Sequence, residues 1–346
     1  METLWFCLVA AMLAVYVVLD GFDLGAGIVH FWVGRTDDER RLVLRSIGPV
    51  WDGNEVWLLA AGGTLYFAFP VLYASSFSGF YLPLMIVLWL LILRGISIEF
   101  RGHVESPVWV PFWDLVFAGS SMLLAVFLGA ALGNVVRGVP LDAQGYFFEP
   151  LWTDFQLGPE TGILDWYTIL IGVAALVVLA LHGALWVALK TEGGVNARAR
   201  QAARFLWWWV VGFTALITAV TFRVQPHVPA RLQDQPWGFV FPILALAGLM
   251  GVWWFLRQPD DLKSFLSSCA YILGMLTSVA FGLYPYVLPA STNPDYGLTV
   301  YSAKAADYGL QIGFYWWIPG MMLATAYFVY VYRRFSSKVT LKEEGY

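Results

Sequence analysis

The sequence has little charge. Only 13% of its 346 residues are Asp, Glu, Lys or Arg, roughly half of the share found in soluble domains. It also has few cysteines, because Cys7 and Cys269 are the only two, and this excludes a disulfide framework and a CxxC metal or redox pair. The net charge of −4 argues against nucleic-acid binding, which requires a basic face.

Apolar residues are abundant instead, at 59% of the chain, and 18 Trp, 17 Tyr and 25 Phe can anchor helices at lipid headgroups. A membrane-spanning helix needs about 20 mostly apolar residues. Nine windows qualify, and the second is the weakest because it opens on the polar run Trp51-Asp-Gly-Asn-Glu55. The sequence therefore predicts an all-α polytopic membrane protein with nine transmembrane helices, at residues 4–32, 50–70, 77–101, 112–136, 163–189, 203–222, 236–256, 264–288 and 311–332.

The basic residues predict the orientation of these spans. If nine spans alternate, fifteen of the twenty basic residues fall on the side of the C-terminus, four fall on the other side, and Arg94 lies within a span. Short cytoplasmic connections carry an excess of Lys and Arg. We therefore expect the N-terminus outside the cell and the C-terminus in the cytoplasm.

Two acids stand in the first span, within Asp20-Gly-Phe-Asp-Leu-Gly-Ala-Gly27. Asp20 and Asp23 are three residues apart and share one helix face. The interspersed glycines let another helix approach closely, which would enclose the carboxylates. Since charge inside a membrane is costly, a buried polar or proton-handling role is favoured. The alternative is that both acids lie at wet membrane depth and only shape how the helices pack.

The second polar group opens the second span, in Gly48-Pro-Val-Trp-Asp-Gly-Asn-Glu-Val-Trp57. Pro49 can start a helix, and Asp52 and Glu55 would favour its positive N-terminal end. A cytoplasmic proton entrance is the functional interpretation, since carboxylate chains carry protons through membranes. Helix capping is an equally favoured interpretation, and both can hold together.

The third group is Leu93-Arg-Gly-Ile-Ser-Ile-Glu-Phe-Arg101. Arg94 lies about two turns inside the third span, and a buried guanidinium requires partners. The natural candidates are Asp23, Asp52 and Glu99. An ion pair that holds helices together and a role in proton transfer are equally compatible with this pattern.

Histidines in or near the spans are few. His30 and His182 could in principle ligate a haem, but no second pair and no supporting spacing accompany them, so roles in helix packing are favoured. Motifs of metalloproteases, serine hydrolases, P-loop NTPases and dinucleotide-binding enzymes are absent from credible contexts. The residues alone thus predict an acid–base cluster on spans one to three and identify no substrate.

At the same three clusters the sequence resembles a known family, subunit II of cytochrome bd ubiquinol or menaquinol oxidase. The resemblance rests on several motifs in the same order along the whole chain: Asp20-Gly-Phe-Asp-Leu-Gly-Ala-Gly27, Trp51-Asp-Gly-Asn-Glu-Val-Trp-Leu58, Ala61-Gly-Gly63, Phe77-Ser-Gly-Phe-Tyr81, Gly133-Asn134 with Gly138-Val-Pro140, and Tyr284-Pro-Tyr-Val-Leu-Pro289. Separated motifs in register are far more specific than any one of them.

The resemblance implies a heterodimeric terminal oxidase of a prokaryotic cytoplasmic membrane, which oxidises quinol on the outer side and reduces oxygen to water. Cytoplasmic protons are consumed, so charge separation rather than pumping generates the proton-motive force. Haem b558, haem b595 and haem d are expected on subunit I, which would be the partner of this chain. Small single-helix subunits can attach, and family members can hold a structural quinone or lipid in this subunit.

Carried over position by position, the resemblance places Asp52 and Arg94 on a proton route, with Asp20 and Asp23 as the acids of the first-span motif. Glu55 stands where the family carries Gln or Glu, and Glu99 lies in a less uniform stretch. The implied fold is one membrane domain over 1–346, with four-helix bundles at 1–136 and 163–288 and a peripheral helix at 311–332.

Two other functions remain open from the residues. Acids on glycine-rich membrane helices would also suit a proton-coupled secondary transporter, although no halves with matching broken helices are recognisable. The chain could also be a purely structural scaffold that seals and supports subunit I.

Overall fold

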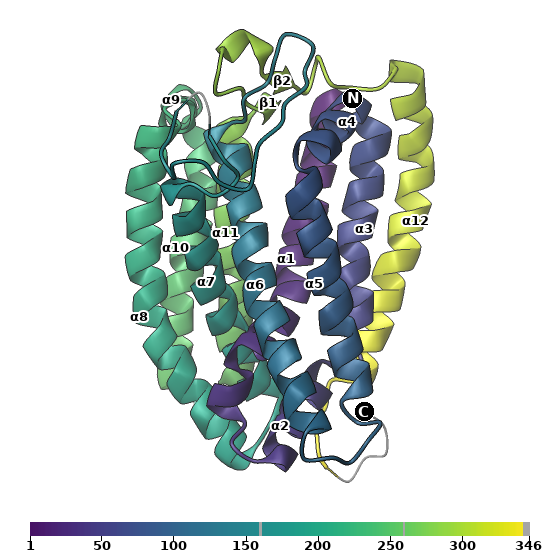
Figure 1. Cartoon of the computed structure of the whole chain (residues 1–346), viewed down its shortest axis with the longest axis vertical. Coiled ribbons are helices and arrows are strands. Elements are labelled where there is room, and N and C mark those ends of the chain that lie inside the picture. The colour runs from purple at the N-terminus through teal and green to yellow at the C-terminus, as the bar shows by residue number, and fades with distance from the viewer. Residues whose placement is uncertain (159–160, 259, 342–346) are drawn as a thin grey trace.

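The computed structural model describes residues 1–158, 161–258 and 260–341. Long helices run side by side along the longest axis of the molecule, with short helices and loops at both ends (Figure 1). The long helices are α1 (Glu2–Val33), α3 (Trp51–Ala68), α5 (Tyr81–Phe100), α6 (Trp109–Arg137), α7 (Trp166–Lys190), α8 (Gly193–Val224), α10 (Val240–Arg257), α11 (Asp261–Leu283) and α12 (Asp307–Arg334). The shorter ones are α2 (Asp37–Ile47), α4 (Pro70–Gly79) and α9 (His227–Asp234).

The two ends of the molecule differ. One end, called here the α2 end, carries α2 and the described part of the C-terminal segment. The other, called the loop end, carries the N-terminus, a small hairpin and the described residues 138–158 and 161–165 of the connection 138–165 (Figure 1). The basic residues expected in the cytoplasm lie in connections, in α2 or in the helix turns nearest the α2 end, with Arg204 the deepest at about three turns inside α8. Lys342 lies outside the described residues. The unequal distribution of charge is therefore present in the fold.

Among the described residues, eight helices are long and apolar enough to cross a membrane: α1, α5, α6, α7, α8, α10 with its preceding 3-10 turn (Pro236–Phe239), α11 and α12. This confirms the all-α polytopic class. The window 50–70 corresponds to α3, which lies along α1 but is not one of the eight. Polar residues of its first turns, such as Asp52 and Glu55, lower its mean hydropathy, and the ninth span stays a prediction.

One predicted boundary is wrong. The span expected at 264–288 ends as α11 at Leu283, and the chain then forms β1 (Tyr286–Leu288), which pairs antiparallel with β2 (Leu298–Thr299). Pro285 explains the early end, because proline has no N–H for a helix and disfavours the helical conformation of the residue before it. The apolar residues 284–288 do not extend the helix and are instead half-buried or buried at the loop end.

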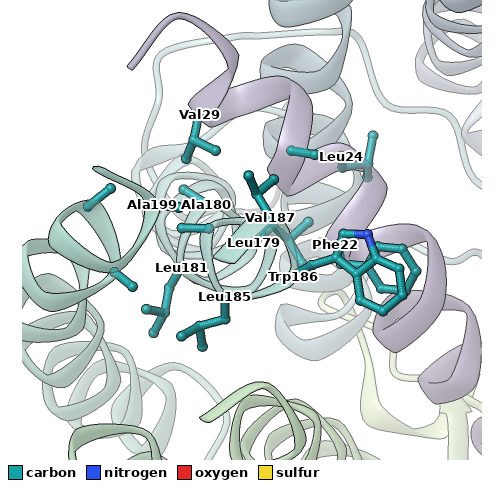
Figure 2. Close-up of a cluster of buried hydrophobic side chains, with 14 of the residues drawn as sticks. Phe22, Leu24, Val29, Leu179, Ala180, Leu181, Leu185, Trp186, Val187 and Ala199 are labelled. Atoms are coloured by element: carbon teal, nitrogen blue, oxygen red, sulfur yellow. The ribbon is translucent and has the colours of Figure 1, made fainter. Parts of the chain in front are cut away.

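The core runs without interruption through helices of both predicted bundles, and its centre is the contact between α1 and α7. Figure 2 shows this cluster, in which Phe22 of α1 stacks on Trp186 of α7 with ring centroids 4.0 Å apart. The helix α12 lies at the edge of the molecule next to α3 (Figure 1), and Leu310 is its one buried residue.

Glycines allow α1 and α7 to touch through their backbones. A Cβ atom added to Gly25 would lie 2.0 Å from the carbonyl oxygen of Leu179, and one added to Gly183 would lie 2.0 Å from the carbonyl carbon of Gly25. Gly27 likewise faces Ser121 of α6. The close helix approach expected from the glycines of the first span is confirmed.

The segment after α12 crosses the α2 end and ties this helix to α7. The ammonium of Lys190 donates to the carbonyls of Phe335 and Ser337, and the backbone N–H of Val339 donates to the carbonyl of Lys190 at 2.8 Å. Because α12 buries so little of its own length, these contacts at its end contribute much of its attachment.

Candidate functional site

A buried guanidinium joins three helices in the first half of the chain. Nη2 of Arg94 on α5 is 2.6 Å from Oδ1 of Asp20 on α1 and 2.5 Å from Oε1 of Glu55 on α3. The side chains of Arg94 and Asp20 are fully buried, whereas that of Glu55 is 26% exposed. Glu55 is therefore the member of this group that reaches the surface of the chain.

Asp23 belongs to the same site but reaches a different partner. Nδ2 of Asn54 donates to Oδ2 of Asp23 at 2.8 Å, and the hydroxyl of Tyr332 on α12 donates to Oδ1 of Asn54 at 2.8 Å. Asp23 and Asn54 are fully buried. The amide of Asn54 thus fixes Asp23 and connects the peripheral helix to the centre of the molecule.

We call Asp20, Asp23, Glu55 and Arg94 the acid–arginine cluster. At a rise of 1.5 Å per helical residue, Glu55 lies about 6 Å and Arg94 about 9 Å from the ends of α3 and α5 at the α2 end, and Asp23 and Asp20 lie about 15 Å and about 20 Å from the end of α1. One guanidinium here faces three carboxylates. With all four groups ionised the cluster is negatively charged, and uncompensated charge inside a membrane is costly. A group of this composition can store protons and pass them on.

The structure brings together four of the six predicted site residues. Asp52 is exposed in the first turn of α3, where its Oδ1 accepts from the backbone N–H of Gly53 at 2.7 Å. It lies one helical turn from Glu55, toward the α2 end. Glu99 is exposed in the last turn of α5, outside the cluster.

The expected partners of Arg94 were Asp23, Asp52 and Glu99, and this expectation is corrected to Asp20 and Glu55. Asn54 and Tyr332 were missed as functional candidates. Asn54 could have been predicted as a hydrogen-bond partner of a carboxylate, because it is a neutral amide between Asp52 and Glu55. Tyr332 gave no such signal, because it lies among other aromatic residues near the end of the last helix.

A second charged group, centred on Asp114 in α6, lies at the α2 end. Its carboxylate is 2.7 Å from Nε2 of His30, and Nε of Arg101 donates to it at 2.6 Å. Arg101 also pairs with Asp37 of α2 at 2.7 Å, and Nη1 of Arg40 lies 3.4 Å from Asp114. These contacts fasten α2 against α5 and α6. Asp114 was not among the residues predicted from the sequence.

A third group lies at the loop end, where α6 ends and α7 begins, and its Glu149 belongs to the connection outside the spans. Arg137 pairs with Asp165 and, at 2.7 Å, with Glu149 of the connection 138–165, and Glu149 accepts a further hydrogen bond from Thr161. The side chain of Glu149 is fully buried. Burial raises its pKa from 4.5 to about 7, although Arg137 opposes the rise. One guanidinium again serves two carboxylates, Asp165 and Glu149.

This third group predicts a pH-dependent stability. The folded pKa of Glu149 lies above its unfolded value, so its protonated form stabilises the fold, and this contribution is lost as the pH rises from about 4.5 to about 7. The difference between the two values corresponds to about 3 kcal/mol. We expect Glu149→Gln to flatten the dependence of the melting temperature on pH between 5 and 8, measured by scanning fluorimetry of the purified complex. The exposed Glu105 provides the control Glu105→Gln, and an unchanged slope in Glu149→Gln would contradict the prediction.

Comparison with known proteins identifies the family. The family model described as cytochrome bd terminal oxidase subunit II matches residues 1–335. The chain belongs to this family. Its relatives include a Bacillus subtilis protein named cytochrome bd ubiquinol oxidase subunit 2, which is 33% identical over 90% of this chain and 89% of that protein. A probable cytochrome oxidase subunit 2 of Haemophilus influenzae is 30% identical over 96% and 93%.

The cytochrome bd subunit II family also accounts for the fold. A solved structure of bd oxidase from Geobacillus thermodenitrificans superimposes with a TM-score of 0.75, covering 96% of this chain and 98% of the matched chain at 19% identity. The chain is thus a multi-pass membrane subunit in a family of quinol-oxidising respiratory oxidoreductases. The family functions with haem in the complex.

Each histidine of this cytochrome bd subunit contacts another group of the chain. Nε2 of His30 contacts Asp114, while His182 donates from Nε2 to the carbonyl of Val18 and contacts the hydroxyl of Ser268 through Nδ1. His103 and His227 each contact a backbone carbonyl. Every imidazole thus has at least one ring nitrogen engaged with another group of the chain, and we assign no step to haem here.

Proposed function

We propose that the chain supports the haem-bearing subunit I of a bd-type quinol oxidase and conducts cytoplasmic protons toward the site of oxygen reduction. The observation that carries the proposal is the acid–arginine cluster, which lies inside the transmembrane helices and reaches the surface of the chain through Glu55. Ionisable residues at such depth mark proton relays. Oxygen reduction consumes protons, so a subunit without redox centres contributes by delivering them.

The proposed route starts at Asp52, which is exposed at the α2 end. Glu55 follows one turn deeper on the same helix, and the ion pair of Arg94 with Asp20 lies beside it. Tyr16 is buried one turn beyond Asp20 on α1. Asp23 lies beside this route as a further proton-holding group, and its carboxylate accepts a hydrogen bond from Asn54. In this proposal the α2 end faces the cytoplasm, as the basic residues predict, and α3 is the ninth transmembrane helix.

We further propose that subunit I covers the outer faces of α3 and α5. Large apolar side chains stand exposed there, including Leu59 at 75%, Trp89 at 63% and Tyr66 at 62%. Glu55 opens on this side, so a partner seated on these helices would receive protons directly. Haem b558, haem b595 and haem d would lie on that partner, in agreement with the histidines of this chain.

The route predicts the result of a single substitution. Asp52→Asn keeps the size of the side chain but removes its titratable group, so we expect oxygen reduction to slow by at least about tenfold, since positioned acids and bases contribute 10²–10⁴-fold. The measurement is oxygen uptake by the purified complex with excess quinol, together with its haem content. The matched control is Glu99→Gln, an exposed acid outside the cluster, which should leave turnover unchanged.

The same experiment separates the alternatives. If Asp52→Asn turns over like the wild type at normal haem content, Asp52 only caps its helix. If Asp23→Ala, Asp52→Ala and Arg94→Ala lose assembly with no proton-transfer defect in the remaining complex, the chain is a structural scaffold. Substrate uptake by the chain alone in liposomes would favour the secondary transporter.

A further inference from the structure

A cavity of about 200 Å³ opens at the α2 end between α1 and α8. It is lined by Trp32, Arg35, Arg198, Gln201 and Phe205. It shares no residue with the acid–arginine cluster or with the group around Asp114. The elements that form it are the last turn of α1 and the residues after it, and the first third of α8.

The cavity carries an excess of one positive charge. Arg198 is held in place, since its Nε donates to the carbonyl of Val33 at 2.8 Å and its Nη2 pairs with Glu39 at 2.5 Å. Arg35 is exposed, and among the described residues only its backbone N–H has a partner, the carboxylate of Glu39, while its guanidinium has none. Glu39 pairs with the guanidinium of Arg198, so the guanidinium of Arg35 is left with a charge that a single phosphodiester would balance.

Aromatic rings continue from the cavity along the lipid-facing side of α8. The ring centroids of Trp32 and Phe205 are 5.7 Å apart. Those of Phe205 and Trp209 are 6.3 Å apart, and those of Trp209 and Phe213 are 6.4 Å apart. Trp32, Phe205 and Trp209 are 45%, 55% and 53% exposed. From residue 205 to residue 213 the track is about 12 Å long. It thus leads from the charged cavity into the depth of the membrane.

We propose that this cavity binds an anionic phospholipid. Its phosphate would lie between Arg35 and Arg198, and one acyl chain would follow the track of Phe205, Trp209 and Phe213. A free phosphate would use only the charged half of the site and leave the aromatic track without a ligand. An uncharged amphiphile would use the track and leave Arg35 unpaired. An anionic lipid satisfies both halves, and it would fasten α1 to α8 at the membrane surface.

The test uses the purified complex in detergent, delipidated and titrated with dioleoylphosphatidylglycerol, with bound lipid counted by native mass spectrometry. We expect one tightly held lipid. Arg35→Gln should weaken it about fivefold, the effect of one basic residue near an anionic membrane surface, and Phe205→Ala should also weaken it. Neither residue supports the fold through a buried contact. The control is Arg334→Gln, which removes an exposed charge at the same end of the molecule and should leave binding unchanged.

Two further probes distinguish the ligand classes. Dioleoylphosphatidylcholine, which has the same chains and no net charge, should bind at least fivefold more weakly. Glycerol 3-phosphate, which has a phosphate and no chains, should not displace the lipid. Displacement by glycerol 3-phosphate would identify a free-phosphate site and overturn the proposal. Equal affinity in Arg35→Gln and wild type, or an equal loss in Arg334→Gln, would overturn it as well.

Discussion

Replacing Arg94 with glutamine is expected to remove most of the assembled complex from the membrane. The substitution leaves Asp20 and Glu55 facing each other inside the helices without a counter-charge. Breaking a buried ion pair by removing one partner costs about 3–5 kcal/mol, a large part of the stability of a typical domain. The measurement is the yield and melting temperature of the purified complex.

A double variant shows whether charge balance is the cause. Asp20→Asn together with Arg94→Gln removes one charge of each sign, so we expect the yield to recover substantially while oxygen reduction stays slow. Arg223→Gln, at an exposed position on α8, controls for the loss of a guanidinium as such. If the double variant assembles no better than Arg94→Gln alone, the geometry of the guanidinium matters more than its charge.

A single methyl group at Gly183 is expected to have an effect of similar size. In Gly183→Ala the new Cβ would lie 2.0 Å from the backbone of α1 at Gly25, and no side-chain rotation can relieve a contact with backbone. Overpacked cores lose about 1–3 kcal/mol, and we expect at least the upper end because two central helices must move apart. The measurement is the melting temperature of the complex.

The same substitution at an open position is the control for Gly183→Ala. An added Cβ at Gly212 of α8 meets nothing within 4 Å, and alanine favours a helix over glycine by up to about 1 kcal/mol. Gly212→Ala should therefore leave the melting temperature unchanged or raise it slightly. Equal melting temperatures for Gly183→Ala and wild type would show that α1 and α7 do not touch as described.

Features within one helix were predictable from the sequence. The spacing of Asp20 and Asp23 gave their common face, and the glycines after them gave the close approach that Gly25 makes to α7. Local chemistry would also have ended α11 before Pro285. These properties depend on neighbours in the chain, and a sequence displays such neighbours directly.

Contacts between helices were harder to predict, and the partners of Arg94 show why. In a membrane protein the core-facing and lipid-facing sides of a helix are both apolar, so hydropathy does not tell how a helix is rotated. Asp23, Asp52 and Glu99 were as plausible as Asp20 and Glu55 on that basis. Asn54 and Tyr332 are 278 residues apart in the sequence, and Asp114 and His30 are 84 residues apart. No local sequence pattern predicts contacts between residues so far apart.

The contact of Tyr332 with Asn54 has a consequence for biosynthesis. A membrane protein is made and inserted from its N-terminus, so α1 enters the bilayer with two carboxylates before the ribosome has made Arg94, and long before it has made Tyr332. The acids of the first helix acquire their counter-charge from α5, and the amide that holds Asp23 acquires its last partner only when α12 is complete. The surroundings of the acid–arginine cluster are therefore complete only once α12 is in place, and a chain that lacks α12 would leave this part of the site unfinished.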